Sequence, residues 1–160
     1  MIRAILAHDS QYGIGKDGDL PWPKNSEDLK WFKESTSGST VVMGRSTWES
    51  LPFKPLPNRH NMVVSSKMKV QYGVEIIRPD IYKSRMNVMS QHEDLWIIGG
   101  AQLLESSLDI IDELWLNNVG GEYDCDVFLP YRKIESIFKV DQIEIRTFGV
   151  VSKLIKRTIK

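Results

Sequence analysis

Two short, almost continuously apolar runs constrain the fold of this chain most strongly. They are Thr40-Val41-Val42-Met43, which Gly44 follows, and Trp96-Ile97-Ile98, which Gly99 and Gly100 follow. Runs of this kind are typical of central strands that are covered on both faces. They predict a sheet buried between layers of helices.

Strand patterns and helix patterns alternate along the rest of the chain. We expect strands at residues 3–8, 40–44, 61–65, 74–77, 95–98, 113–119, 137–145 and 148–156. We expect helices at residues 26–35, 46–51, 81–89 and 101–108. The alternation predicts an α/β fold with a mainly parallel sheet, and the last two strands predict an antiparallel C-terminal edge. Open sheets of this type bind ligands at the carboxyl ends of their strands.

Composition excludes several classes of protein. The chain has 160 residues, for which we expect a single domain of residues 1–160, and its 21 basic and 21 acidic side chains cancel. This balance gives no bulk attraction to nucleic acid or to a membrane. Cys125 is the only cysteine, so an intramolecular disulfide is excluded, and three scattered histidines predict no metal site. The apolar start is too short for a signal peptide, so we expect a cytoplasmic protein. No heptad pattern or obvious apolar patch demands assembly, so we expect a monomer.

Asp28 stands out within the helix expected at residues 26–35. Leu29, Trp31 and Phe32 form one apolar arc of this helix, and Asp28 falls between Trp31 and Phe32. A buried, unpaired carboxylate is costly, so Asp28 should bind a ligand or have a fixed hydrogen-bond partner. A simpler interpretation stays open, because an acid in the first turn after Asn25 also favours the helix dipole.

The segment at residues 9–24 contains a misleading motif. Gly13, Gly15 and Gly18 match the pattern G-x-G-x-x-G, which binds dinucleotides only where a helix begins at the glycines. Pro21 and Pro23 forbid that helix. We therefore expect a long loop, which is either a lid over a binding site or an exposed connection.

Three strand–helix or strand–loop turns suit phosphate groups. Gly44 leads from a buried strand towards Arg45, and the Gly99–Gly100 pair repeats this pattern. Together they suggest one extended ligand with several phosphates. The turn Ser65-Ser66-Lys67 offers two hydroxyls and an ammonium, which suit the 2′-phosphate that distinguishes NADP from NAD. Each turn taken alone is also compatible with an ordinary turn that binds nothing.

The order and spacing of these motifs give the chain a family resemblance over its whole length. The motifs are Gly13-Ile14-Gly15, Leu20-Pro21-Trp22, Asp28-Leu29 with Trp31-Phe32-Lys33, Met43-Gly44-Arg45-Ser46-Thr47-Trp48-Glu49-Ser50, Pro55-Leu56-Pro57 with Arg59 and Asn61, Ser65-Ser66, Ile97-Ile98-Gly99-Gly100, and Asp126 before Phe128-Leu129-Pro130. On these motifs the chain resembles the dihydrofolate reductases.

The resemblance implies an eight-stranded, mostly parallel sheet with four flanking helices. It also implies reduction of 7,8-dihydrofolate to tetrahydrofolate with NADPH, a step of one-carbon metabolism that antifolates target. Hydride would pass to pterin C6, and N5 would gain a proton. Asp28 would pair with the 2-amino group and N3 of the pterin and would act as the catalytic group through electrostatic assistance.

The resemblance also assigns binding residues. The expected substrate-binding residues are Ile5, Leu6, Ala7, Leu20, Asp28, Leu29, Phe32, Ser50, Leu51, Leu56, Arg59, Ile98 and Asn117. Arg59 would bind the α-carboxylate of the glutamate tail. The expected cofactor-binding residues are Ala7, Ile14, Gly15, Asp19, Leu20, Gly44, Arg45, Ser46, Thr47, Val64, Ser65, Ser66, Lys67, Ile98, Gly99, Gly100, Ala101, Gln102 and Leu103. Of these, Ile14, Asp19 and Leu20 match a mobile loop that closes over the nicotinamide.

The chain departs from the family pattern at several positions. Asn117 stands where threonine usually faces the carboxylate, and Gln102 where arginine sometimes occurs. Ala101, Leu104 and Val127 replace a common glycine, tyrosine and threonine. Two other functions stay open. One is a related reductase of another heterocycle, such as the pyrimidine of riboflavin synthesis, and the other is a nucleotide-binding protein without turnover.

Overall fold

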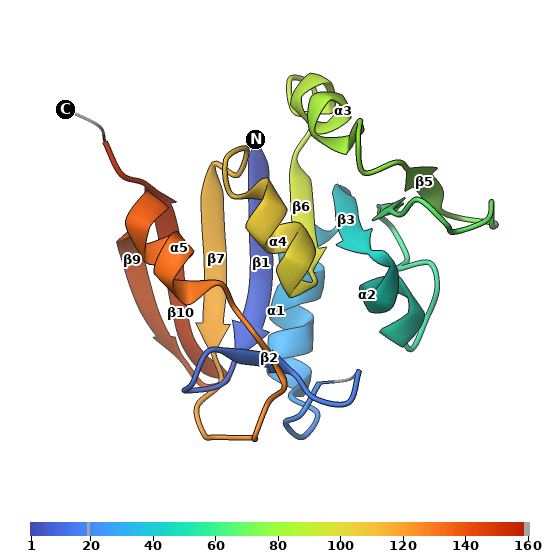
Figure 1. Ribbon diagram of the computed structural model, residues 1–160. Helices are drawn as coiled ribbons and strands as arrows, with labels where there is room; N and C mark the ends of the chain where they lie inside the picture. Colours follow the sequence, from blue (N-terminus) through green and yellow to red (C-terminus); the bar gives the residue numbers. More distant parts are fainter. Residues whose placement is uncertain (19, 159–160) are drawn as a thin grey trace.

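The computed structural model describes residues 1–18 and 20–158 and contains one large sheet (Figure 1). Its eight strands are β1 (Ile2–His8), β3 (Thr40–Gly44), β4 (His60–Val64), β5 (Glu75–Ile77), β6 (Leu95–Gly99), β7 (Glu113–Asn118), β9 (Phe138–Arg146) and β10 (Gly149–Lys156). The strand order is β5-β4-β3-β6-β1-β7-β10-β9. The first six strands in this order are parallel, whereas β10 is antiparallel to both β7 and β9. The predicted mostly parallel sheet with an antiparallel C-terminal edge is confirmed.

Within residues 1–18 and 20–158, five helices accompany the sheet. They are α1 (Ser26–Thr36), α2 (Arg45–Ser50), α3 (Tyr82–Met89), α4 (Ala101–Ser107) and α5 (Tyr131–Ile137). The first four lie at the predicted positions. The sequence analysis did not anticipate α5, although Pro130 directly precedes it and proline is common where helices begin.

A second, very small sheet lies within the segment that was expected to be a loop. In it, β2 (Gly13–Gly15) pairs antiparallel with β8 (Val127–Phe128). The prediction of an irregular segment is therefore wrong at residues 13–15. Two glycines in three residues carry no strand pattern, so only pairing with a distant segment makes this strand regular. In the described part of the segment from β2 to α1 there is no α-helix, as the two prolines predicted.

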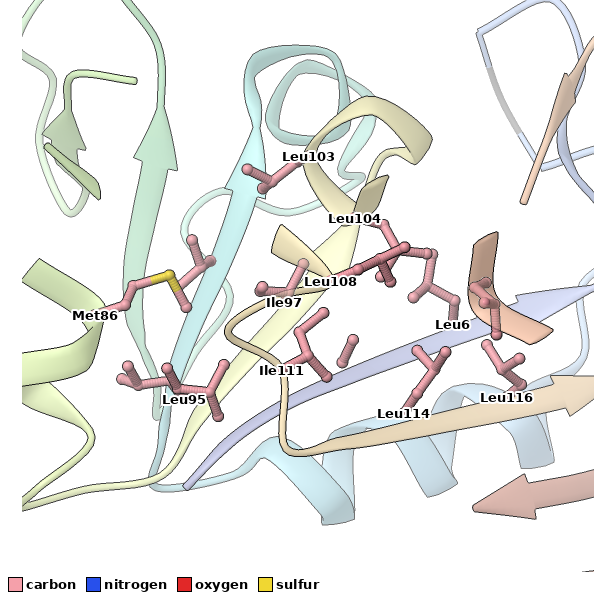
Figure 2. Close-up of a cluster of buried hydrophobic side chains, with 14 of the residues drawn as sticks. Leu6, Met86, Leu95, Ile97, Leu103, Leu104, Leu108, Ile111, Leu114 and Leu116 are labelled. Carbon is pink, nitrogen blue, oxygen red and sulfur yellow. The ribbon is translucent and has the colours of Figure 1, made fainter. Parts of the chain in front are cut away.

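The core consists of two clusters, one on each face of the sheet. Figure 2 shows the larger one, to which α3, α4 and α5 contribute Met86, Leu104 and Ile134 among other residues. The smaller cluster includes Trp48 of α2, and the rings of Trp31 and Phe32 of α1 pack against it. In Figure 1, α4 lies in front of the sheet and α1 behind it. The helices thus cover both faces, as the apolar runs predicted.

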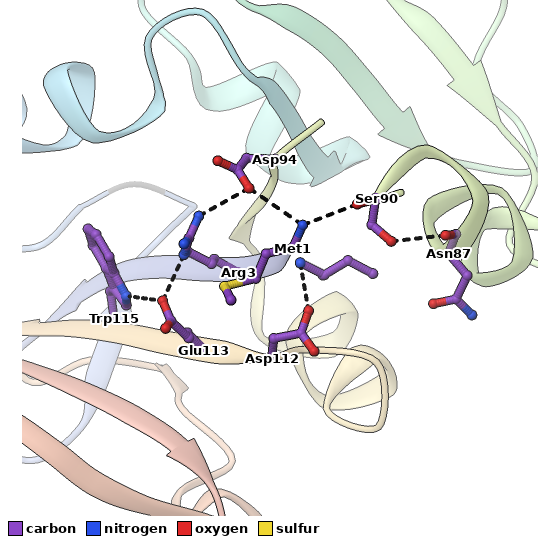
Figure 3. Close-up of polar contacts among 9 residues, drawn as sticks. Met1, Arg3, Asn87, Ser90, Asp94, Asp112, Glu113 and Trp115 are labelled. Atoms are coloured by element: carbon purple, nitrogen blue, oxygen red, sulfur yellow. Dashed lines mark hydrogen bonds and ion pairs between the residues drawn. The ribbon is translucent and has the colours of Figure 1, made fainter. Parts of the chain in front are cut away.

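Polar contacts fix the strands at the edge opposite to the carboxyl ends of the parallel strands (Figure 3). The guanidinium of Arg3 contacts Asp94 at 3.3 Å and Glu113 at 2.7 Å, so it connects β1 with residues next to β6 and on β7. The backbone N–H of Ile2 donates to Oδ2 of Asp112 at 2.8 Å. These contacts set the alignment of the central strands. Among the described residues, no helix is long and apolar enough to cross a membrane.

Candidate active site

The two glycine turns meet at the carboxyl ends of neighbouring strands. Met43 of β3 is paired with Gly99 of β6, so the turns that follow these strands lie side by side. A Cβ atom at Gly44 would lie 3.9 Å from the backbone nitrogen of Gly100. The peptide bond between Gly99 and Gly100 is cis, and Gly99 has φ of 129°. The two turns are therefore neighbours, as a single extended ligand that contacts both would require.

These turns have the features that a pyrophosphate requires. Gly44 and Gly100 are the N-cap residues of α2 and α4, and neither helix has a side-chain cap on its first N–H groups. A Cβ atom at Gly99 would approach the hydroxyl oxygen of Thr47 to 3.4 Å. The small residues therefore leave backbone N–H groups accessible beside a hydroxyl. Backbone donors of this kind fit the phosphates of a dinucleotide.

A basic cavity of about 360 Å³ adjoins the first of these turns. It is lined by Arg45, Trp48, Glu49, Lys54, Lys67, Met68, Lys69 and Gln71. Four of these side chains are cationic, and the only acid, Glu49, already contacts Nε of Arg45 at 2.7 Å. The hydroxyl of Ser65 accepts the N–H groups of Lys67 and Met68 and shapes the turn. The cavity therefore suits an anionic group such as a phosphate monoester.

The other predicted cofactor residues differ from one another in how exposed they are. Gln102 and Ser66 are exposed, Ser46 is exposed at the start of α2, and Ala101 is partly exposed at the start of α4. Leu103 is buried in the larger core cluster, and Val64 packs against that cluster. Lys54 and Lys69 of the basic cavity were not predicted. Their positive charge was the available signal, but nothing in the sequence places their loops beside Arg45.

Asp28 is buried, with 8% of its surface exposed, on the first turn of α1. Its Oδ1 accepts a 2.7 Å hydrogen bond from Nδ2 of Asn117, a fully buried residue of β7. The side chain of Asn25 caps α1 by accepting the backbone N–H of Asp28 at 3.1 Å. Both interpretations of Asp28 are thus combined, since it is a first-turn acid and also a buried carboxylate with a fixed partner.

The electrostatics of Asp28 follow from this position. Among the described residues, no cationic side chain forms an ion pair with it. Burial raises the pKa of Asp28, and the hydrogen bond from Asn117 opposes this in part. A carboxylate of this kind is stabilised by a ligand that supplies positive charge or N–H donors.

Asn117 depends on a glycine of the neighbouring strand. A Cβ atom at Gly149 of β10 would lie 2.1 Å from Oδ1 of Asn117, so no larger residue fits there without a shift. Nδ2 of Asn117 also lies 3.4 Å from the carbonyl oxygen of Phe148, which accepts a second bond from Asn25. The start of β10 therefore encloses the pair of Asp28 and Asn117.

An apolar wall lies on the same face as Asp28. Phe32, Leu51, Leu56 and Ile98 are partly buried and pack against the cluster that contains Ile5. All five were expected to bind the substrate, and the fold brings them together in one cluster.

Other predicted wall residues lie elsewhere. Leu6 belongs to the larger cluster on the opposite face, because neighbouring residues of a strand alternate in direction, so its side chain does not join this wall. Leu29 is 43% exposed and belongs to neither cluster, so its predicted place in the substrate pocket stays a prediction. Ala7 is partly buried on β1, and Ser50 is exposed, with its hydroxyl bonded to the carbonyl of Thr47.

Arg59 lies beside the aromatic ring of Phe32. Its guanidinium carbon is 5.8 Å from the ring centroid, Nε donates to the carbonyl of Pro57, and Nη1 donates to the hydroxyl of Thr36 at 3.1 Å. Among the described residues, no carboxylate pairs with it, although burial lowers its pKa. The guanidinium stays charged in proteins and has N–H groups left for a carboxylate.

The predicted lid is connected to the segment before β8. The N–H of Asp126 donates to the carbonyl of Gly15 at 2.9 Å, and the N–H of Asp17 donates to Oδ2 of Asp126 at 3.0 Å. Ile14 packs against the larger cluster, and Leu20 is 53% exposed. Asp19 lies outside the described residues.

Comparisons with known proteins agree with this geometry. The sequence model of the family described as dihydrofolate reductase matches residues 1–147. The dihydrofolate reductase of Haemophilus influenzae is 38% identical over 126 residues, which cover 79% of this chain and 76% of that protein. That of Bacillus subtilis is 38% identical over 131 residues, or 81% and 76%.

Two further similarities extend the comparison. A bifunctional dihydrofolate reductase-thymidylate synthase of Paramecium tetraurelia is 40% identical over 140 residues, but the match spans only 30% of that longer protein. The solved structure of dihydrofolate reductase from Enterococcus faecalis, complexed with NADP(H) and RAB-propyl, has a TM-score of 0.85 and 28% identity, and the match covers 99% of this chain and 97% of that one. The chain belongs to the dihydrofolate reductase family.

Proposed function

We propose that this chain catalyses the NADPH-dependent reduction of 7,8-dihydrofolate to 5,6,7,8-tetrahydrofolate. The observation that carries the proposal is Asp28, a buried carboxylate with no cationic partner among the described residues, beside an apolar wall. A pterin ring supplies what this site lacks, because its 2-amino group and N3 present N–H donors and its faces are apolar.

The cofactor site follows from the two glycine turns and the basic cavity. We assign the pyrophosphate to the N–H groups that follow Gly44 and Gly100, with Thr47 beside them. We assign the 2′-phosphate to Arg45 and Lys67 of the basic cavity. NADPH, when bound, supplies the hydride that pterin C6 receives. The remaining roles belong to side chains of the protein.

Asp28 has two roles in the proposed reaction. It orients the pterin through its carboxylate oxygens, and its negative charge stabilises the positive charge that develops on the ring when N5 gains a proton. The carboxylate makes N5 more basic, and the proton comes from water. The hydride and this proton together saturate the C6–N5 bond. Asn117 keeps Asp28 in place by holding Oδ1.

Arg59 and the lid complete the site. The free N–H groups of Arg59 form a two-point pair with the α-carboxylate of the glutamate tail. Ile14 and Leu20, which lie on either side of the one internal residue that the structure does not describe, close over the nicotinamide and exclude water from the hydride transfer. We also propose that the protein is a monomer, lies in the cytoplasm and is inhibited by antifolates.

The test is NADPH absorbance in the presence and absence of 7,8-dihydrofolate. We expect a loss of absorbance that depends on dihydrofolate and is much slower with NADH. The same assay with the pyrimidine intermediate of riboflavin synthesis should show no reaction. Absence of dihydrofolate-dependent oxidation would refute the proposed function.

A further inference from the structure

A carboxylate outside the pterin pocket joins two distant segments. Asp9 directly follows β1 and is only 1% exposed. Its Oδ1 accepts the backbone N–H groups of Gln11 at 2.9 Å and Gly13 at 2.8 Å. Its Oδ2 accepts the N–H of Tyr123 at 3.2 Å and the thiol of Cys125 at 3.4 Å. One side chain thus binds the approach to β2 and the segment before β8.

The charge of Asp9 is compensated by these donors alone among the described residues. Burial raises the pKa of Asp9, but the hydrogen bonds from Gly13, Gln11, Cys125 and Tyr123 outweigh burial and lower it overall. Asp9 is therefore ionised at neutral pH. Hydrogen bonds to a charged acceptor are stronger than those to a neutral one, so the ionised form holds both segments firmly.

Gly13 and Cys125 fit together at the same place. A Cβ atom at Gly13 would lie 2.3 Å from Sγ and 2.4 Å from Cβ of Cys125, and 3.1 Å from Oδ1 of Asp9. The backbone of Gly13 is not in the left-handed region, so its φ does not require glycine. The side chain of Cys125 occupies the space that any larger residue at position 13 would need.

We infer that Asp9, Gly13 and Cys125 form a clasp that holds β2 against residues 121–126 and makes Asp9 a positioning residue for hydride transfer. The inference rests on the proposed function, in which Ile14 closes over the nicotinamide. Gly13 and Gly15, on either side of Ile14, are paired with Phe128 and Val127 of β8. Because the clasp ends where Ile14 begins, it determines where the lid lies relative to the cofactor.

The first test replaces Asp9 with asparagine. In Asp9→Asn one of the two carboxylate oxygens becomes an NH2 group, which donates and cannot accept. The two N–H or S–H donors that faced this oxygen then face another donor. We expect kcat/KM for NADPH to fall by about tenfold to a hundredfold, as a small misplacement of reacting groups does. The KM for dihydrofolate should change much less, and the isotope effect with deuterated NADPH should rise because hydride transfer becomes slower.

Asp112→Asn is the matched control. Oδ2 of Asp112 also accepts a backbone N–H, that of Ile2, but at the opposite end of β1 (Figure 3). This variant should lower the Tm without changing the kinetic constants for NADPH. If Asp9→Asn behaves in the same way, with a lower Tm and unchanged kinetics, the positioning role is refuted.

The second test is a double-mutant cycle between Gly13 and Cys125. Gly13→Ala should lower kcat/KM for NADPH, because its methyl group overlaps Cys125. Cys125→Gly removes both overlapping atoms, so the double variant should regain most of the activity that Gly13→Ala loses. If the double variant loses as much kcat/KM for NADPH as the two single variants combined, the clasp is refuted. If the protein without substitutions does not oxidise NADPH when dihydrofolate is added, the proposed function is refuted instead.

Discussion

Asn117 donates a 2.7 Å hydrogen bond to Asp28 although 89 residues separate them in the chain. The bond connects β7 with α1 and holds one carboxylate oxygen of Asp28. It also explains why the start of β10 is glycine, since Gly149 leaves the space that the amide of Asn117 occupies. The carboxylate is therefore fixed before any ligand arrives, which is the arrangement that electrostatic assistance requires.

Asp28→Asn should make the protein more stable at neutral pH. Burial raises the pKa of Asp28, so the folded state binds its proton more tightly than the unfolded chain. Stability therefore falls as pH rises from the unfolded pKa of about 3.9 through the higher folded pKa, and an amide avoids this loss. We expect Tm to rise by about 2–4 °C for each kcal/mol by which the variant is more stable than the unchanged protein. This rise in Tm should become smaller towards acid pH. Thermal unfolding followed by circular dichroism checks this, and an Asp28→Asn variant less stable than the unchanged protein at neutral pH would contradict it.

Asn117→Leu should raise the pKa of Asp28 further. Leucine has a similar size but no N–H donor, so burial then acts without the opposing hydrogen bond. The pKa read from the pH dependence of kcat/KM for dihydrofolate should move upward. Asn117→Thr retains a hydroxyl donor, so it should shift the pKa of Asp28 less than Asn117→Leu does. A pH profile that both variants leave unchanged would show that this bond does not act on the reaction.

Arg59→Leu should weaken the binding of dihydrofolate much more than that of NADPH. Loss of a two-point pair with a carboxylate is worth about 2–5 kcal/mol, which appears mainly as a higher KM for dihydrofolate. Arg59→Lys should retain only part of the affinity for dihydrofolate, because an ammonium lacks the two parallel N–H donors of the planar guanidinium. Arg78→Leu is the control, since Arg78 is exposed and its guanidinium forms an ion pair with the exposed Asp80, outside the candidate site. Equal effects of Arg59→Leu on both substrates would mean that Arg59 is structural.

Charge removal in the basic cavity should reduce the preference for NADPH over NADH. We expect Arg45→Gln and Lys67→Gln each to lower kcat/KM for NADPH by roughly tenfold and to leave that for NADH nearly unchanged. Lys139→Gln, on the exposed strand β9, serves as the control. Steady-state kinetics with both cofactors at low salt measures the ratio. An equal loss with both cofactors would place the 2′-phosphate elsewhere.

Most of the fold could be predicted because its signals are local. The run from Thr40 to Met43 is buried on both sides and forms β3, as its composition indicates. The small sheet of β2 and β8 could not be predicted, because a three-residue strand with two glycines owes its regularity to a partner more than a hundred residues away. Helix α5 is also short, and Ile134 is its only buried residue.

The site divides in the same way. The glycine turns could be predicted, since each follows a buried strand directly. Burial of Asp28 followed from its place among Trp31 and Phe32, whereas its partner Asn117 came only from the family resemblance. Asp9 gave no signal, because its four donors come from two segments that only the folded chain brings together.

The most direct test of the central claim compares the unchanged protein with Asp28→Asn in the oxidation of NADPH by 7,8-dihydrofolate, from alkaline to acid pH. At neutral pH we expect turnover of the variant to be lower by roughly 10²-fold, because no carboxylate then assists protonation at N5. Turnover should recover in part as pH falls, since the solvent then supplies protonated substrate. Near-normal turnover of Asp28→Asn at neutral pH would contradict the role of Asp28.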